Sequence, residues 1–477
     1  MRLAVLVLLP VLALAAAPSL EIQSVLDLAH SAPAEVAADA LIRVAALDQL
    51  SKPRRVELFE QAFALAPFAP QPYKRRSGLA RSIGPSGFLN RAYEQDLDTL
   101  SLQLRAVEGL LPLAPRKARE HFMEIAPLRL PQLSCDDFLV YDVDRFYEVL
   151  GEVAGQTFSA KEIHDEEPTK FLAGYIATVT SAAQVAPVAR LLENVPGKDA
   201  EYQSLTAAFA GALGRISSDG RSFLYGASAA GPSIQKLAEL CRRRQISPQI
   251  VLESYRQFLV SHLAGPRCAD DTQTKWIGSA ADVAAYFNSN LAIPPLQPID
   301  MGAITPAQTE GEAKGLAWCE DSECQAMRGQ YLALIFSENG FASHPQEREQ
   351  NEWQAKVRDF LAAMAAWTES SGATPVEHFR EKVGLFSELL IVVPNGPTRE
   401  FVLRSLLQFL LQNRLPPENR LEWLLPVTQL AGRVGLDPSS WGDTADDLRR
   451  ANDSVIALSI ALEAIAPRPL SAVMPLL

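Results

Sequence analysis

Four aspartates form the densest group of carboxylates in the sequence. They are Asp136, Asp137, Asp142 and Asp144, within SCDDFLVYDVD. Such a group could bind a hard cation, or supply the acid and the base of a hydrolase. Calcium loops space their ligands with glycine and asparagine, whereas mainly apolar residues separate the two pairs here. We therefore expect these aspartates to cap a helix and face solvent, and we predict no metal site.

The sequence offers no other catalytic signature. Its six histidines are scattered and none forms HExxH, and it contains no GxSxG elbow, Walker loop or Rossmann glycine fingerprint. We therefore expect no cofactor and favour a binding protein over an enzyme. The alternative is a cell-envelope hydrolase in which Asp136, Asp137 or Glu369 does the acid–base work.

A basic segment runs from Lys52 to Arg91 in an otherwise acidic chain. It has eight basic residues but only Glu57 and Glu60 as acids, whereas the whole chain has a net charge of −12. Two of its arginines are expected in the first turn of a helix, where the helix dipole favours acids instead. This placement suggests an anionic partner, although pairing within the molecule would explain it equally. The candidate binding residues are Arg54, Arg55, Lys74, Arg75 and Arg76.

The five cysteines suggest an oxidising compartment. Cys135 and Cys268 lie in loop-like settings, and we predict a disulfide between them. Cys319 and Cys324 could close a small loop. Cys241 lies in a helical pattern and is expected to be a buried free thiol.

The first fifteen residues have the pattern of a signal peptide. Met1 and Arg2 precede an apolar run from Leu3 to Leu14, and Ala13-Leu14-Ala15 matches a small-x-small cleavage site. We predict cleavage after Ala15 and export to the periplasm or the cell exterior, with an uncleaved anchor as the alternative. We expect no transmembrane segment in the mature chain, and its acidic charge argues against nucleic acid as a partner.

Amphipathic helices are predicted along most of the chain. Residues 35–67 show two of them, joined by a turn at Ser51-Lys52-Pro53, and neither helix can bury its apolar stripe alone. Residues 217–232 are rich in glycine and serine and predict a loop. The prolines within 291–315 predict a linker or crossing loop between an N-terminal region, 16–290, and a C-terminal region, 316–477. The predicted fold is all-α, with stacked antiparallel helical hairpins in an irregular α-solenoid-like arrangement.

Phe59, Ala62 and Pro67 have the spacing of the second helix of a helical-hairpin repeat, and Ala118, Phe122 and Ile125 match part of it. Through these residues, about a quarter of the chain resembles tetratricopeptide-like α-solenoid proteins. The chain departs from the family pattern because the first-helix tryptophan, Leu-Gly and tyrosine are not matched. Otherwise the chain resembles uncharacterised exported all-helical bacterial proteins.

These patterns together favour an exported, non-enzymatic helical scaffold that binds a protein, a peptide or an anionic envelope polymer. Besides the hydrolase, a carrier of an apolar small molecule is a further alternative, and it would require a large apolar pocket.

Overall fold

The computed structural model describes residues 20–77, 95–133, 139–195, 197–216, 220–267, 280–304, 307–308, 322–336, 351–369, 374–436 and 454–467. The predicted signal peptide, 1–15, lies outside this part of the chain. Helices dominate the described residues, and the strands among them are two or three residues long. The predicted all-α class is therefore confirmed.

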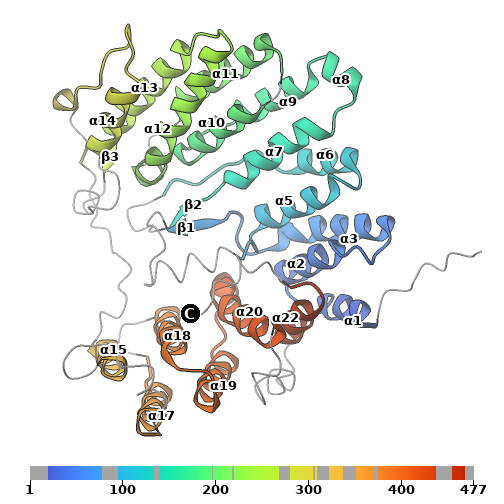
Figure 1. Ribbon diagram of the computed structural model, residues 1–477, viewed down its shortest axis with the longest axis vertical. Coiled ribbons are helices and arrows are strands. Elements are labelled where there is room, and N and C mark those ends of the chain that lie inside the picture. Colours follow the sequence, from blue (N-terminus) through green and yellow to red (C-terminus); the bar gives the residue numbers. More distant parts are fainter. Residues whose placement is uncertain are drawn as a thin grey trace, which may run out of the picture.

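Most of the helices up to residue 290 form two rows (Figure 1). Neighbouring helices of a row pack against each other, and each row follows the order of the chain. The first row is α2 (Ala34–Ala45), α5 (Thr99–Leu110), α7 (Asp144–Gln156), α10 (Val185–Asn194), α12 (Gly220–Arg243) and α14 (Ala280–Asn290). The second row is α3 (Lys52–Leu65), α6 (Pro115–Glu124), α9 (Glu167–Ile176), α11 (Asp199–Leu213) and α13 (Gln249–Leu263).

Short elements connect these helices. The sequence shows no alternating pattern for the strands because they are too short to display one. Strand β1 (Arg75–Ser77) pairs antiparallel with β2 (Leu139–Tyr141), and β3 (Pro266–Arg267) pairs parallel with β4 (Ala307–Gln308). The remaining short helices are α8 (Ala160–His164), η1 (Ala66–Phe68), η2 (Ala182–Gln184), η4 (Met301–Ala303) and η5 (Pro417–Asn419).

The predicted hairpin of residues 35–67 is present as α2 and α3. Pro53 lies in the first turn of α3, where its missing N–H leaves no hydrogen bond unmade. The Nε of Arg55 donates a hydrogen bond of 2.8 Å to the carbonyl of Ala45, the last residue of α2. The two apolar stripes pack together, as the pattern required.

The predicted loop at 217–232 is wrong from Gly220 onward, because α12 begins there. Small residues in this stretch allow close packing between elements. A side chain at Gly226 would meet the carbonyl oxygen of Ala182 at 3.1 Å, and one at Gly231 would meet the ring of Tyr286 at 2.8 Å. Tertiary packing therefore overrides the low helix propensity of glycine and serine.

The C-terminal helices pack on one another, and the last of them contacts the N-terminal helices (Figure 1). The last helix, α22, contacts both α1 (Leu20–Ala29) and α2. The described part of 291–315 contacts α13, because Arg256 of α13 donates a hydrogen bond of 2.6 Å to the carbonyl of Gln297. The C-terminal helices are α15 (Ser322–Ile335), α17 (Asn351–Ala366), α18 (Pro375–Val392), α19 (Pro397–Gln412), α20 (Arg420–Leu436) and α22 (Ser454–Ile465).

Three charged residues on one side of α2 join these distant parts, and we call them the α2 ion row: Glu35, Asp39 and Arg43. Glu35 is fully buried and accepts hydrogen bonds from Arg420 of α20. Asp39 accepts one of 2.7 Å from Arg105 of α5. Arg43 lies 2.8 Å from Glu463 of α22 and donates to the carbonyl of Ala466. The row therefore couples α2 to three other helices.

Loss of one member of the α2 ion row should destabilise the protein strongly. We expect Arg43→Ala to lower the free energy of unfolding by about 3 kcal/mol, because Glu463 and the Ala466 carbonyl lose a buried partner. The matched control Arg54→Ala removes only an exposed pair with Glu57 and should cost about 0–1 kcal/mol. Urea unfolding followed by circular dichroism measures both, and equally small losses would contradict the role of the row.

Candidate functional site

Two of the predicted binding residues, Arg54 and Arg55, lie at the start of α3. Arg54 pairs with Glu57 at 2.7 Å on the surface. Arg55 pairs with Asp48 at 3.1 Å and also bonds the end of α2. Arg55 therefore contributes to the α2–α3 hairpin, which gives it a structural role at a position that the helix dipole disfavours.

The other three, Lys74, Arg75 and Arg76, lie on or next to β1. Lys74 pairs with Asp96 at 2.6 Å, and Arg76 pairs with Asp142 at 3.3 Å. Arg75 donates to the carbonyl of Leu139 at 3.1 Å, within the small sheet. All five predicted cations thus have intramolecular partners, which is the second of the two explanations that the sequence allowed. Binding of an anionic partner by these residues stays a prediction.

The aspartates of the sequence motif do not form a metal site in the described part of the chain. Asp136 and Asp137 lie outside the described residues. Asp142 pairs with Arg76, and Asp144 pairs with Arg190 at 2.5 Å. Among the described residues, no three histidine, cysteine, aspartate or glutamate side chains are grouped so as to hold a metal ion. Glu369 is exposed.

Of the cysteines, Cys241 is buried and free, as predicted, and burial raises the pKa of its thiol. Cys135, Cys268 and Cys319 lie outside the described residues, and Cys324 is buried. The two proposed disulfides therefore stay predictions.

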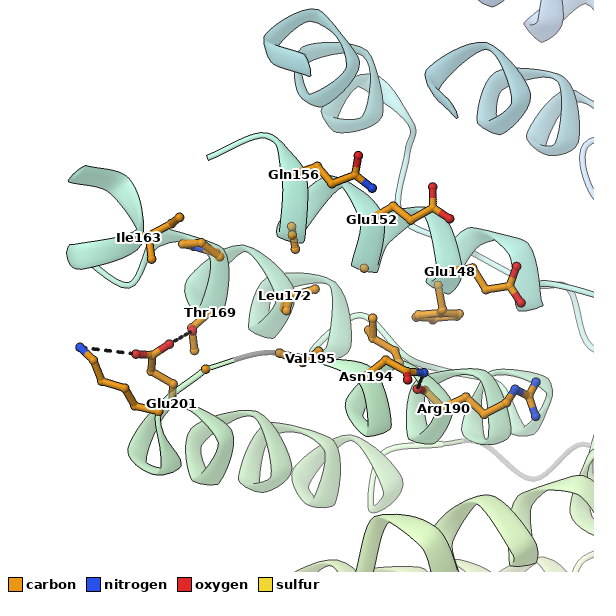
Figure 2. Close-up of a pocket in the computed structure, with 18 of the residues that line it drawn as sticks. Glu148, Glu152, Gln156, Ile163, Thr169, Leu172, Arg190, Asn194, Val195 and Glu201 are labelled. Carbon is orange, nitrogen blue, oxygen red and sulfur yellow. Dashed lines mark hydrogen bonds and ion pairs between the residues drawn. The ribbon is translucent and has the colours of Figure 1, made fainter. Parts of the chain in front are cut away.

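A groove of about 1000 Å³ lies between α7 and α10, and we call it the α7–α10 groove (Figure 2). Its volume is at the upper end of the range for ligand sites in proteins. The short helix α8 and the starts of α9 and α11 close its sides. Its lining comprises Asp144, Tyr147, Glu148, Gly151, Glu152, Ala154, Gly155, Gln156, Ala160, Ile163, His164, Pro168, Thr169, Leu172, Pro187, Arg190, Leu191, Asn194, Val195, Gly197, Lys198 and Glu201.

Two glycines on α7 create much of this hollow. Gly151 and Gly155 are four residues apart and therefore lie on the same side of the helix. At Gly151 a side chain would meet Leu191 of α10 at 3.0 Å, so the two helices approach closely there. At Gly155 a side chain would meet nothing within 4 Å. The helices are thus in contact near Gly151, and space opens beside Gly155.

A row of polar side chains runs along the α7 wall. Figure 2 shows Glu148, Glu152 and Gln156 in succession on this helix, and Arg190 and Asn194 on α10; the side chains of Glu152 and Gln156 point away from α10. Glu148 pairs with Arg145 at 2.7 Å. Glu152 makes no ion pair or hydrogen bond with any described residue, and it is half-buried. The α7 wall therefore presents a carboxylate without an internal partner.

The opposite end of the groove is fixed by a bridge between α9 and α11. The hydroxyl of Thr169 donates a hydrogen bond of 3.0 Å to Glu201, whose second oxygen lies 3.8 Å from Lys198 (Figure 2). Between the two ends, Leu172, Leu191 and Val195 are buried and apolar. Ile163 of α8 is 53% exposed, so an apolar contact is available at the rim.

Buried contacts hold α7, α9 and α10 in these positions. Gln184 is fully buried, accepts hydrogen bonds from the backbone N–H groups of Thr180 and Ser181, and donates one of 2.8 Å to the Tyr147 hydroxyl. Phe146 of α7 packs against Tyr175 of α9 with ring centroids 5.9 Å apart. The groove is therefore built on fixed helices.

The charge around the groove is predominantly negative. Between Asp144 and Glu201 the sequence has ten acidic and five basic residues, whereas the whole chain has 56 and 44. Burial raises the pKa of Asp144, although its pair with Arg190 opposes the shift. The segment that builds the groove is therefore more acidic than the rest of the protein.

The sequence pattern does not predict this groove. Its local signal is the pair Gly151 and Gly155 on a strongly amphipathic helix, beside Glu148 and Glu152. Such glycines could equally pack against a neighbouring helix, and Gly151 does so. Whether each glycine contacts a neighbouring helix or borders open space depends on the path of α10.

No protein-family model, curated protein or solved structure matches this chain. Within the described residues, no helix is both long enough and apolar enough to span a bilayer. The fold and the site thus define an all-α protein with the α7–α10 groove in an acidic segment of the chain.

A separate titrating group lies next to Lys74. Asp98 caps α5 by accepting a hydrogen bond of 3.0 Å from the N–H of Ser101, and it is buried. Burial raises the pKa of Asp98 to about 6, against the opposing effects of Ser101 and Lys74. The folded state therefore binds a proton at Asp98 more tightly than the unfolded state does. The protonated Asp98 carboxyl contributes stability at low pH, and this contribution is lost as the pH rises from 3.8 to about 6.

Replacement of Asp98 should change how stability depends on pH. Asp98→Asn keeps a capping oxygen and removes the titration, so the variant should be more stable than the wild type by about 1–3 kcal/mol at roughly pH 8. The difference should shrink as the pH falls below about 5. Urea unfolding at several pH values measures it, and a difference that does not vary with pH would contradict the raised pKa.

Proposed function

We propose that this protein is an exported, non-enzymatic helical scaffold that binds a segment of a partner protein in the α7–α10 groove. The observation that carries the proposal is the groove itself, with about 1000 Å³ of space, fixed walls and an open side at Gly155. Helix pairs that pack in rows commonly use such concave surfaces to bind peptides.

The chemistry of the lining favours a peptide over the other candidate ligands. Carboxylates and amides along the wall can bond a peptide main chain and polar side chains, whereas Leu172, Leu191 and Ile163 can contact aliphatic ones. An apolar carrier would not need Glu148 and Glu152 in its pocket. An anionic polymer would meet repulsion from the acidic surroundings.

Blocking the groove should abolish peptide binding. A Cβ at Gly155 would have no neighbour within 4 Å, and Gly155 lines the groove, so Gly155→Trp should fold normally and fill part of the groove. Gly174→Trp is a matched control, because Gly174 also has no neighbour within 4 Å, lies on α9 and does not line the groove. Peptides selected from a random phage-displayed library should bind Gly155→Trp at least about tenfold more weakly than the control.

Binding is measured by fluorescence polarisation, and circular dichroism verifies that each variant folds. Equal affinity of both tryptophan variants for every selected peptide would overturn the groove as the binding site. Failure to select any peptide that distinguishes them would do the same.

Export makes a separate prediction. If the protein is exported as proposed, the mature chain begins at Ala16, because cleavage follows Ala13-Leu14-Ala15. Mass spectrometry of the amino-terminal peptide from the native source measures this. Detection of an intact Met1 peptide in the purified protein would contradict cleavage.

A further inference from the structure

We infer that the α7–α10 groove selects segments that carry a lysine or arginine next to an aliphatic residue, with Glu152 binding the cation. The inference rests on the proposed function and adds the chemical class of the ligand. Three observations support it: the state of the charged groups in the groove, the charge of its surroundings, and the apolar surface near Glu152.

Glu152 differs from the other acidic side chains of the lining because they have partners among the described residues. Asp144 pairs with Arg190, Glu148 with Arg145, and Glu201 with Thr169 and Lys198. Glu152 lies between Glu148 and Gln156 on the same wall and has no such partner in the described structure (Figure 2). A ligand cation can therefore pair with Glu152 without breaking an existing ion pair.

The surroundings of the groove carry more acidic than basic residues, which favours a cation. Asp165, Glu166 and Glu167 directly follow His164, which lines the groove, and all three are exposed. Lys170 pairs with Glu167, whereas Asp165 and Glu166 make no ion pair with any residue that the structure describes. Fields of this kind raise the local concentration of an oppositely charged ligand and its association rate.

Apolar contacts are available beside this charge. Leu172 forms part of the buried lining, and Ile163 is exposed on α8. Gly155 lies three residues after Glu152 on the same side of α7, and a side chain there would meet nothing within 4 Å, so space is open on this side of the helix. A peptide can therefore place its main chain near α7, its cation on Glu152 and an aliphatic side chain against Ile163 or Leu172.

The test uses the peptides selected on the full mature chain. They should be enriched in lysine and arginine beside leucine, isoleucine or valine. Glu152→Gln should weaken their binding by about threefold to tenfold, because a partly exposed ion pair is lost while the shape of the groove is kept. Raising the salt concentration should weaken wild-type binding more than it weakens binding by Glu152→Gln.

Glu239→Gln is the matched control, because Glu239 is exposed on α12 and does not line the groove. It should bind the selected peptides as the wild type does. Equal affinities of Glu152→Gln and wild type, or selected peptides without enriched basic residues, would overturn this inference.

These results separate the inference from the proposed function. Neutral peptides that bind wild type and Gly174→Trp but not Gly155→Trp would leave the scaffold function intact and refute the cation selectivity. Binding of the small polyamine spermidine at least as tight as that of the selected peptides would refute both, because the ligand would then be a small cation.

Discussion

The buried charges of α2 are the constraint on which the rest of the structure depends. Glu35 and Asp39 are almost completely buried, and an unpaired buried carboxylate costs several kcal/mol. Their partners come from α20 and α5, and Arg43 of the same helix bonds α22. Because these partners are far apart in the sequence, α2 can be buried only when the C-terminal helices have returned to it.

The groove follows from this arrangement through the first row of helices. α2 packs on α5, α5 packs on α7, and α7 packs on α10, so the positions of α7 and α10 are tied to the row. Gln184 and Tyr147 fix the start of α10 against α7, and the missing side chain at Gly155 leaves space farther along. The same structure uses the predicted cations, such as Arg55 and Lys74, in internal pairs, and it leaves Glu152 available in the groove.

Much of the fold could be predicted from the sequence, whereas most of the site could not. The apolar spacing and the proline positions predict the hairpin of residues 35–67, which the structure has as α2 and α3. The same local rules fail at α12, where Gly226 and Gly231 are needed for close contact with neighbouring elements. For the basic residues, types and positions are evident, but their partners Asp96 and Asp142 become neighbours only through folding.

The sequence by itself determined the all-α class and the buried thiol Cys241, because helical periodicity and apolar burial are local properties. Only the tertiary structure decided which charges are neutralised and where space remains. An ion pair needs two side chains within about 4 Å, and a groove needs two helices that diverge. Neither the distance between two charged side chains nor the divergence of two helices is encoded in the spacing of residues along a single helix. Glu152 and Gly155 therefore become a candidate site only in the folded chain.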